Sequence, residues 1–168
     1  MHDLLIERGK PMLRTVAAFV VSVLLAGPAL AATPDELTTP IRQFINGFNS
    51  GDTKSAYAAY ATGDITIIDE FAPHIWTGPN GAHAWAAQYD KHATATGVTD
   101  GSVTLGNPTR IEEEGNVAYV ICPTVYNYKE NGVATAEEGQ MTYVLNNGPQ
   151  GWKIRAWTWS GVKPHPAH

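Results

Sequence analysis

The chain has 168 residues, which is enough for one domain of ordinary size and too few for two. It carries 11 Lys and Arg against 16 Asp and Glu, a formal net charge of −5. An acidic chain without a basic cluster argues against binding nucleic acid or anionic lipid. Cys122 is the only cysteine, so no internal disulfide can form, and its apolar surroundings in the sequence favour a small buried side chain over a reactive thiol.

Residues 1–31 have the pattern of a secretory signal peptide. Two basic residues precede an apolar run from Val16 to Leu25, and an Ala-x-Ala sequence ends at Ala31. The run is too short to cross a bilayer as a stable helix, which would be the alternative interpretation. We therefore expect cleavage after Ala31, a periplasmic or secreted protein, and no membrane attachment after cleavage. Met12 would begin a more ordinary signal and is an alternative start.

A first helix is expected near the start of the mature chain. Thr33-Pro34-Asp35-Glu36 combines a capping hydroxyl, a proline in the first position and acids in the first turn. Thr39-Pro40 repeats this signal and leaves the start open. Apolar residues then recur at i, i+3, i+4 and i+7, which places them on one helix face. They are Ile41, Phe44, Ile45 and Phe48.

Two more helices are expected before the chain changes character. Residues 49–52 end the first helix and cap a short one over residues 53–60. A third helix is expected from about residue 82 to residue 96, with Trp85 and Tyr89 on its packing face.

Strands are expected in the rest of the chain, with one strand before the third helix. Asn131-Gly132 is a strong hairpin signal, and Gly106-Asn107-Pro108 indicates a bulge or a sheet edge. The expected strands cover residues 65–69, 103–111, 117–129, 134–145 and 152–160, with a charged turn at 112–116 and a frayed tail at 164–168. Helices followed by a long antiparallel meander indicate a single α+β domain over residues 32–163.

This order of elements resembles the nuclear transport factor 2-like superfamily, which includes ketosteroid isomerases, scytalone dehydratase and polyketide cyclases. Residues 44–52, ending Phe-Asn-Ser-Gly-Asp, look like the family's first helix, and Trp152-Lys153-Ile154 looks like its closing strand. Ile67-Ile68-Asp69 through Gly78 resembles the isomerase stretch in which the catalytic Asp is followed nine residues later by Gly. The resemblance covers about residues 34–161. It implies a cone-shaped barrel, in which a strongly curved mixed or antiparallel sheet wraps around the N-terminal helices and leaves a pocket at its open end.

The same resemblance makes Asp69 the candidate catalytic base. Burial at the end of an apolar strand would raise the pKa of its carboxyl group and improve it as a base. His74 lies five residues later and is a candidate acid, or else a surface loop histidine. The chain departs from the isomerases because Phe44 stands where they have a tyrosine hydroxyl, and Gln140-Met141-Thr142 has no Asp where they have a second acid. Steroid isomerisation is therefore not expected.

An aromatic pocket is expected around this base, although about half of its residues would serve equally well as plain core. The candidate ligand-binding residues are Phe44, Trp76, Trp85, Tyr89, Tyr126, Gln140 and Trp157. Alternation places Trp157 and Trp159 on one strand face without indicating whether that face looks into the pocket. No metal site is expected, because His83 and His92 are nine residues apart on one helix and face opposite ways.

We therefore expect an exported domain of the ketosteroid isomerase-like type that binds a small hydrophobic molecule. If it is an enzyme, it would be a cofactor-independent isomerase, cyclase or dehydratase-like lyase with Asp69 as base. The alternatives are a non-catalytic periplasmic ligand-binding domain and a dimeric interaction domain. The expected protein partner is a second copy of the chain, paired through the sheet.

Overall fold

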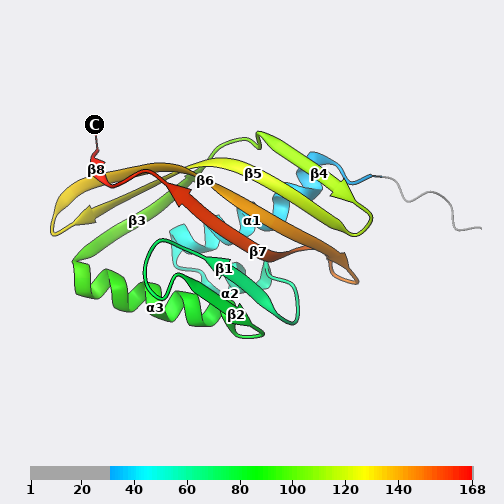
Figure 1. Ribbon diagram of the computed structural model, residues 1–168, viewed down its shortest axis with the longest axis horizontal. Helices are drawn as coiled ribbons and strands as arrows, with labels where there is room; N and C mark the ends of the chain where they lie inside the picture. Colours follow the sequence, from blue (N-terminus) through cyan, green and yellow to red (C-terminus); the bar gives the residue numbers. More distant parts are fainter. Residues whose placement is uncertain (1–30, 168) are drawn as a thin grey trace, which may run out of the picture. The chain divides into compact units, whose positions relative to one another are not determined.

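The computed structural model describes residues 31–167, so the expected signal peptide lies outside the described residues except for Ala31. Three helices and eight strands follow one another within residues 31–167 (Figure 1). No helix within residues 31–167 is long and apolar enough to span a membrane. The elements are α1 (Pro34–Ser50), α2 (Thr53–Ala58), β1 (Ile65–Ile68), β2 (Ile75–Gly78), α3 (Gly81–Thr96), β3 (Val98–Leu105), β4 (Arg110–Glu114), β5 (Val117–Glu130), β6 (Val133–Gly148), β7 (Gly151–Gly161) and β8 (His165–Pro166).

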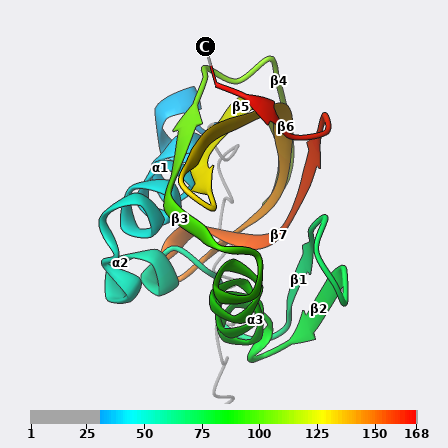
Figure 2. The same ribbon diagram turned by 90° about the vertical axis from the view of Figure 1, so that its left-hand side faces the viewer.

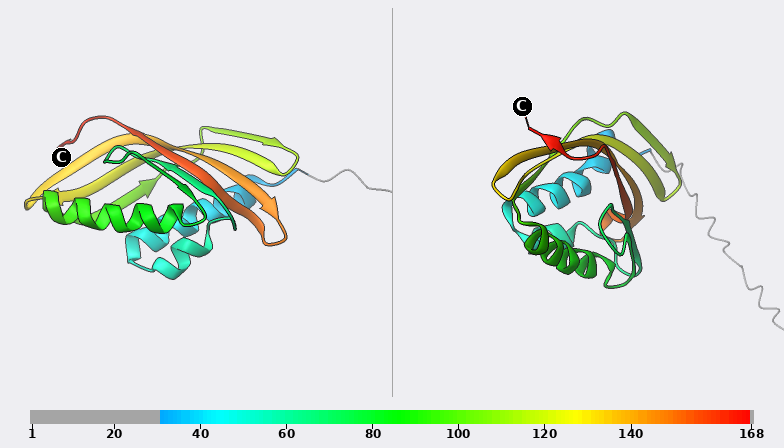
Figure 3. Two further views of the ribbon diagram at one scale, coloured as in Figure 1. Left: turned by 60° about the horizontal axis from the view of Figure 1, so that its bottom comes forward. Right: turned by 60° about the vertical axis from the view of Figure 1, so that its left-hand side comes forward.

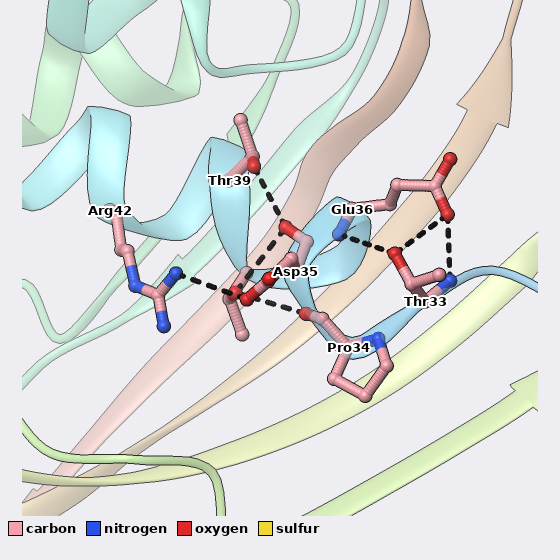
Figure 4. Close-up of polar contacts among 7 residues, drawn as sticks. Thr33, Pro34, Asp35, Glu36, Thr39 and Arg42 are labelled. Carbon is pink, nitrogen blue, oxygen red and sulfur yellow. Dashed lines mark hydrogen bonds and ion pairs between the residues drawn. The ribbon is translucent and has the colours of Figure 1, made fainter.

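Helix α1 begins at the first of the two expected starts, with Thr33 as its N-cap. Thr33 Oγ1 accepts a 3.3 Å hydrogen bond from the Glu36 backbone N–H, and Glu36 Oε2 accepts one of 2.7 Å from the Thr33 N–H, which completes a capping box (Figure 4). Pro40 lies inside the helix, where its missing N–H removes one backbone bond. Thr39 Oγ1 donates to the Asp35 carbonyl at 2.7 Å, so the hydroxyl is satisfied within the preceding turn.

The strands form one mixed sheet in the order β2-β1-β7-β6-β5-β3, with β4 paired to β5 and β8 paired to β6. All pairs are antiparallel except β1 with β7, which run parallel. The sheet curves around α1, and α3 contacts β1 and β2 near one edge and β3 at the other (Figures 2 and 3). The predicted α+β class and curved sheet are confirmed. The sheet does not close into a barrel, and α3 covers the opening instead.

Three local expectations were wrong. The charged residues 112–116 were expected as a turn, but Glu112, Glu113 and Glu114 belong to β4, which pairs with β5 and alternates exposed with half-buried side chains. Strand β2 was expected as loop. Part of the expected frayed tail forms β8, where His165 Nε2 lies 2.6 Å from Glu138 Oε2. In each case the neighbouring strand supplies backbone partners that the local sequence does not reveal.

The concave face of the sheet builds the core. Met141, Tyr143 and Leu145 of β6 alternate inward and are buried, and Tyr143 pairs in register with Trp157 of β7. Trp157 pairs in turn with Ile67 of β1. The register therefore settles the open question about β7: Trp157 is buried on the concave face, and Trp159 shares that face two residues later.

Candidate active site

Asp69 lies at the end of β1 on the concave side of the sheet. Ile65 and Ile67 are buried, and Asp69 continues their alternation as the first residue after the strand. A tight turn follows, in which the Asp69 N–H donates to the His74 carbonyl at 3.0 Å. This hydrogen bond fixes the backbone of Asp69 at the edge of the hydrophobic core.

Two donors hold the Asp69 carboxylate. Trp85 Nε1 of α3 donates to Oδ2 at 2.8 Å, and the Glu70 backbone N–H donates to Oδ1 at 2.8 Å. Burial raises the pKa of Asp69 above its ordinary value of 3.8, while these two bonds and nearby His92 oppose the rise. The group is therefore oriented by fixed donors and remains a stronger proton acceptor than an exposed Asp.

The carboxylate faces a small cavity, here called the Asp69 cavity, with a volume of about 90 Å³. This is less than the roughly 150 Å³ of an apolar protein cavity that takes up benzene, so a ring-sized ligand requires side chains to move apart. Its lining residues are Phe44, Ile45, Phe48, Asp69, Phe71, Trp85, Tyr89, His92, Val98, Val103, Tyr126, Tyr128, Met141, Trp157 and Trp159.

The structure brings His92 rather than His74 to this cavity. The His92 ring stacks on Phe71 with centroids 5.0 Å apart, and it lines the cavity together with Asp69. His74 is exposed, has a positive φ of 71°, and places Nδ1 3.3 Å from the Asp69 backbone oxygen instead of its carboxylate. His92 had a sequence signal, because it lies one helical turn beyond Tyr89 on the same side of α3.

The expected ligand-binding residues divide into two groups. Five of them line the Asp69 cavity: Phe44, Trp85, Tyr89, Tyr126 and Trp157. The other two do not. Trp76 of β2 is buried against Phe71, with ring centroids 5.0 Å apart, and Gln140 of β6 is exposed on the opposite face from Met141.

Two of the tyrosines that line the cavity bond to each other. Tyr89 Oη and Tyr126 Oη lie 2.6 Å apart, and burial raises the pKa of both groups. They meet beside Gly101, where a Cβ would lie 2.7 Å from Tyr89 Oη and 2.8 Å from Tyr126 Oη. The hydroxyl pair thus requires a glycine at this point of β3.

A second acidic group lies behind the cavity and was missed from the sequence. Glu137 is only 3% exposed, and its Oε1 accepts a 2.6 Å hydrogen bond from Tyr128 Oη. Burial and the Glu137 carboxyl group together raise the pKa of Glu70 to about 8. Glu137 Oε2 has no hydrogen-bond partner within residues 31–167, and its carboxyl group lies close enough to Glu70 to disfavour the ionised form of Glu70.

Glu137 would have been identified if the correct face of the expected strand 134–145 had been assigned to the pocket. It shares a face with Met141 and Tyr143, whereas the candidate named from the sequence, Gln140, lies on the exposed face. Glu70 is exposed, and its carboxyl group interacts with that of Glu137. Within the described residues, no group of three or more His, Cys, Asp or Glu side chains could hold a metal ion.

No protein-family model matches the sequence, and no curated protein matches it. Several solved structures match the structure of this chain. A ketosteroid isomerase-like protein from Erwinia carotovora atroseptica is 18% identical with a TM-score of 0.58, over 76% of this chain and 95% of that chain. A nuclear transport factor 2-like superfamily protein from Salmonella enterica serovar Typhimurium is 17% identical with a TM-score of 0.64, over 77% and 91%. A hexachlorocyclohexane dehydrochlorinase is 12% identical with a TM-score of 0.66, over 79% and 87%.

At these identities the likeness establishes the fold. The chain has the nuclear transport factor 2-like fold, as the sequence resemblance predicted.

Proposed function

We propose that the Asp69 cavity binds a small apolar molecule and that Asp69 removes a proton from one of its carbon atoms. The observation that carries this proposal is the Asp69 carboxylate, which is held by Trp85 Nε1 at 2.8 Å, has a raised pKa and faces a cavity lined largely by aromatic rings. A base in such a place meets its substrate with little competing water, which favours proton transfer from carbon.

An elimination suits this cavity better than an isomerisation. In an elimination the proton goes to Asp69 and the electron pair of the broken C–H bond forms the C=C bond. The leaving group departs with the electron pair of the bond that joined it to carbon. In an isomerisation through an enolate, negative charge collects on a substrate oxygen and needs donors there. Phe44 has no hydroxyl, Tyr128 Oη donates to Glu137, and one of the Tyr89 and Tyr126 hydroxyl groups donates to the other, which leaves few free donors for a substrate oxygen. Of the similar structures, the dehydrochlorinase by its name performs an elimination.

The experiment uses ring-sized halogenated compounds in D₂O, followed by NMR. Wild-type protein should catalyse product formation or deuterium uptake at the acidic carbon, and Asp69→Asn should reduce the rate by about 100-fold or more. Asp64→Asn, which changes an exposed acid before β1, should leave the rate unchanged. Equal rates for the wild type and Asp69→Asn would rule out Asp69 as the base.

A non-catalytic binding domain is the second candidate. It is favoured by the small number of free donors around the cavity, which limits the stabilisation of charge on a substrate oxygen. In that case a panel compound would bind in the D₂O experiment and show neither product nor deuterium uptake.

We further propose that the mature protein is exported and pairs with a second copy through its sheet. The leader sequence supports export. Exposed apolar side chains on β5, with Val117 39% and Tyr119 36% accessible, support pairing through the sheet. Sedimentation of the mature chain would test the pairing, and Tyr119→Lys should shift a dimer towards monomer.

A further inference from the structure

A second, larger cavity lies among the three helices and the start of β3. It has a volume of about 490 Å³, and we call it the helical groove. It does not include Asp69 itself but shares five residues with the Asp69 cavity: Phe44, Phe48, Trp85, Tyr89 and Val98. Its other lining residues are Gly47, Gly51, Thr53, Ala56, Tyr57, Tyr60, Ala82, His83, Ala86, Ala87, Asp90, Ala93, Thr99, Asp100 and Gly101.

Aromatic rings supply much of the groove's surface. Tyr57 of α2 and His83 of α3 stack with centroids 3.8 Å apart, and this contact joins the two helices. Phe48 meets Tyr89 edge to face at 5.3 Å. The walls therefore present aromatic faces and edges over a volume large enough for a ligand of one or two rings.

The charged groups that line the groove are predominantly acidic. Asp90 of α3 has no ion-pair partner within residues 31–167, and its charge contributes to the raised pKa values of Tyr57 and Tyr89, in which burial is the larger cause. Asp100 lines the groove from β3 and pairs with Lys129 at 2.8 Å. His83 is the only basic residue among the lining residues. An aromatic surface beside an unpaired carboxylate attracts an organic cation through ring faces and charge together.

A β-bulge presents the second carboxylate. The pairing of β3 with β5 shifts between Thr99 and Ser102, and Asp100 takes a positive φ of 55° at that point. This conformation is uncommon for a residue other than glycine. Lys129 neutralises Asp100, which leaves Asp90 as the carboxylate available to a ligand.

From this juxtaposition we infer that the helical groove is a binding site for a small aromatic amine, separate from the Asp69 cavity. The ring lies against Phe48, Trp85 and Tyr89, and the ammonium group pairs with Asp90. The net charge of −5 adds a general attraction for cations.

The experiment measures binding of 2-phenylethylamine and of its uncharged counterpart 2-phenylethanol to the mature chain by calorimetry. The wild type should bind the amine about 10-fold or more tightly than the alcohol, and Asp90→Asn should remove most of this difference. Asp35→Asn, which changes an exposed acid on α1, is the matched control and should preserve it. Thermal unfolding of each variant establishes that it is folded.

The two cavities are distinguished by Asp69→Asn, which should leave amine binding intact even if it abolishes the proposed proton transfer. NMR shifts on adding the amine should centre on Ala87 and Gly101, which line the groove alone. Equal affinity for amine and alcohol, no loss in Asp90→Asn, no binding of either compound, or loss in Asp69→Asn alone would each overturn the inference.

Discussion

Trp85 Nε1 donates a 2.8 Å hydrogen bond to Asp69 Oδ2, and this bond ties α3 to the end of β1. Trp85 packs edge to face against Trp157 at 5.1 Å, so the donor is held by the core itself. The carboxylate is consequently oriented by a rigid side chain rather than by solvent.

Replacing Trp85 with phenylalanine should raise the pKa of Asp69 further, because the hydrogen bond from Trp85 stabilises the ionised carboxylate. The lost bond leaves a largely buried oxygen without its donor and should reduce the free energy of unfolding by about 1–3 kcal/mol. NMR titration of the Asp69 carboxyl carbon and urea unfolding measure the two effects. Trp152→Phe, at a half-buried position on β7, is the control and should leave the Asp69 titration unchanged.

The stability of the fold should fall as pH rises from about 4.5 to about 8, because the pKa of Glu70 lies near 8 in the folded protein and near 4.5 in the unfolded chain. Over this window the folded state binds a proton that the unfolded state has released, so raising the pH favours unfolding. Glu70→Gln should flatten this dependence in urea unfolding measured across the window. Glu114→Gln, at an exposed position of β4, should retain it. A slope unchanged by Glu70→Gln would contradict the raised pKa of Glu70.

Gly47→Ala should destabilise the packing of α1 on α2. An added Cβ would lie 2.6 Å from the Ala56 backbone nitrogen, which cannot move aside without shifting the helix. The expected loss in the free energy of unfolding is about 1–3 kcal/mol, measured by chemical denaturation. Gly148→Ala provides the comparison, since nothing lies within 4 Å of its Cβ position, and it should change stability little.

Thr33→Ala should weaken the start of α1 by about 1 kcal/mol, because it removes the side chain that accepts from the Glu36 N–H. The measurement is thermal unfolding followed by circular dichroism. Thr39→Ala removes a hydroxyl that bonds only within the helix and should cost less. An equal effect from both substitutions would show that the cap contributes nothing specific.

Local chemistry predicted much of this fold. The Thr33 cap, the Gly51–Asp52 break between α1 and α2, and the hairpin at Asn131 all lie where the sequence indicated. Each depends on residues within a few positions of one another, which is why sequence patterns can detect it.

The candidate site was only partly predictable, because it depends on pairing between distant strands. Asp69 was named from the family resemblance and continues the alternation of β1, whereas His74 was named in place of His92, which lies one helical turn beyond Tyr89. The inward positions of Glu137 and Trp157 depend on the register of β6 with β7. Counting residues outward from the turn between these strands would give that register if the pairing were regular. A register shift between Val144 and Leu145 interrupts that count.

The parallel pairing of β1 with β7 also dictates when the site can exist. Ile67 lies beside Trp157, so the segment carrying Asp69 joins the main sheet only after nearly the whole domain has emerged. A chain interrupted before β7 would leave β1 paired with β2 alone. For an exported protein, this arrangement would delay any chemistry until translocation is complete.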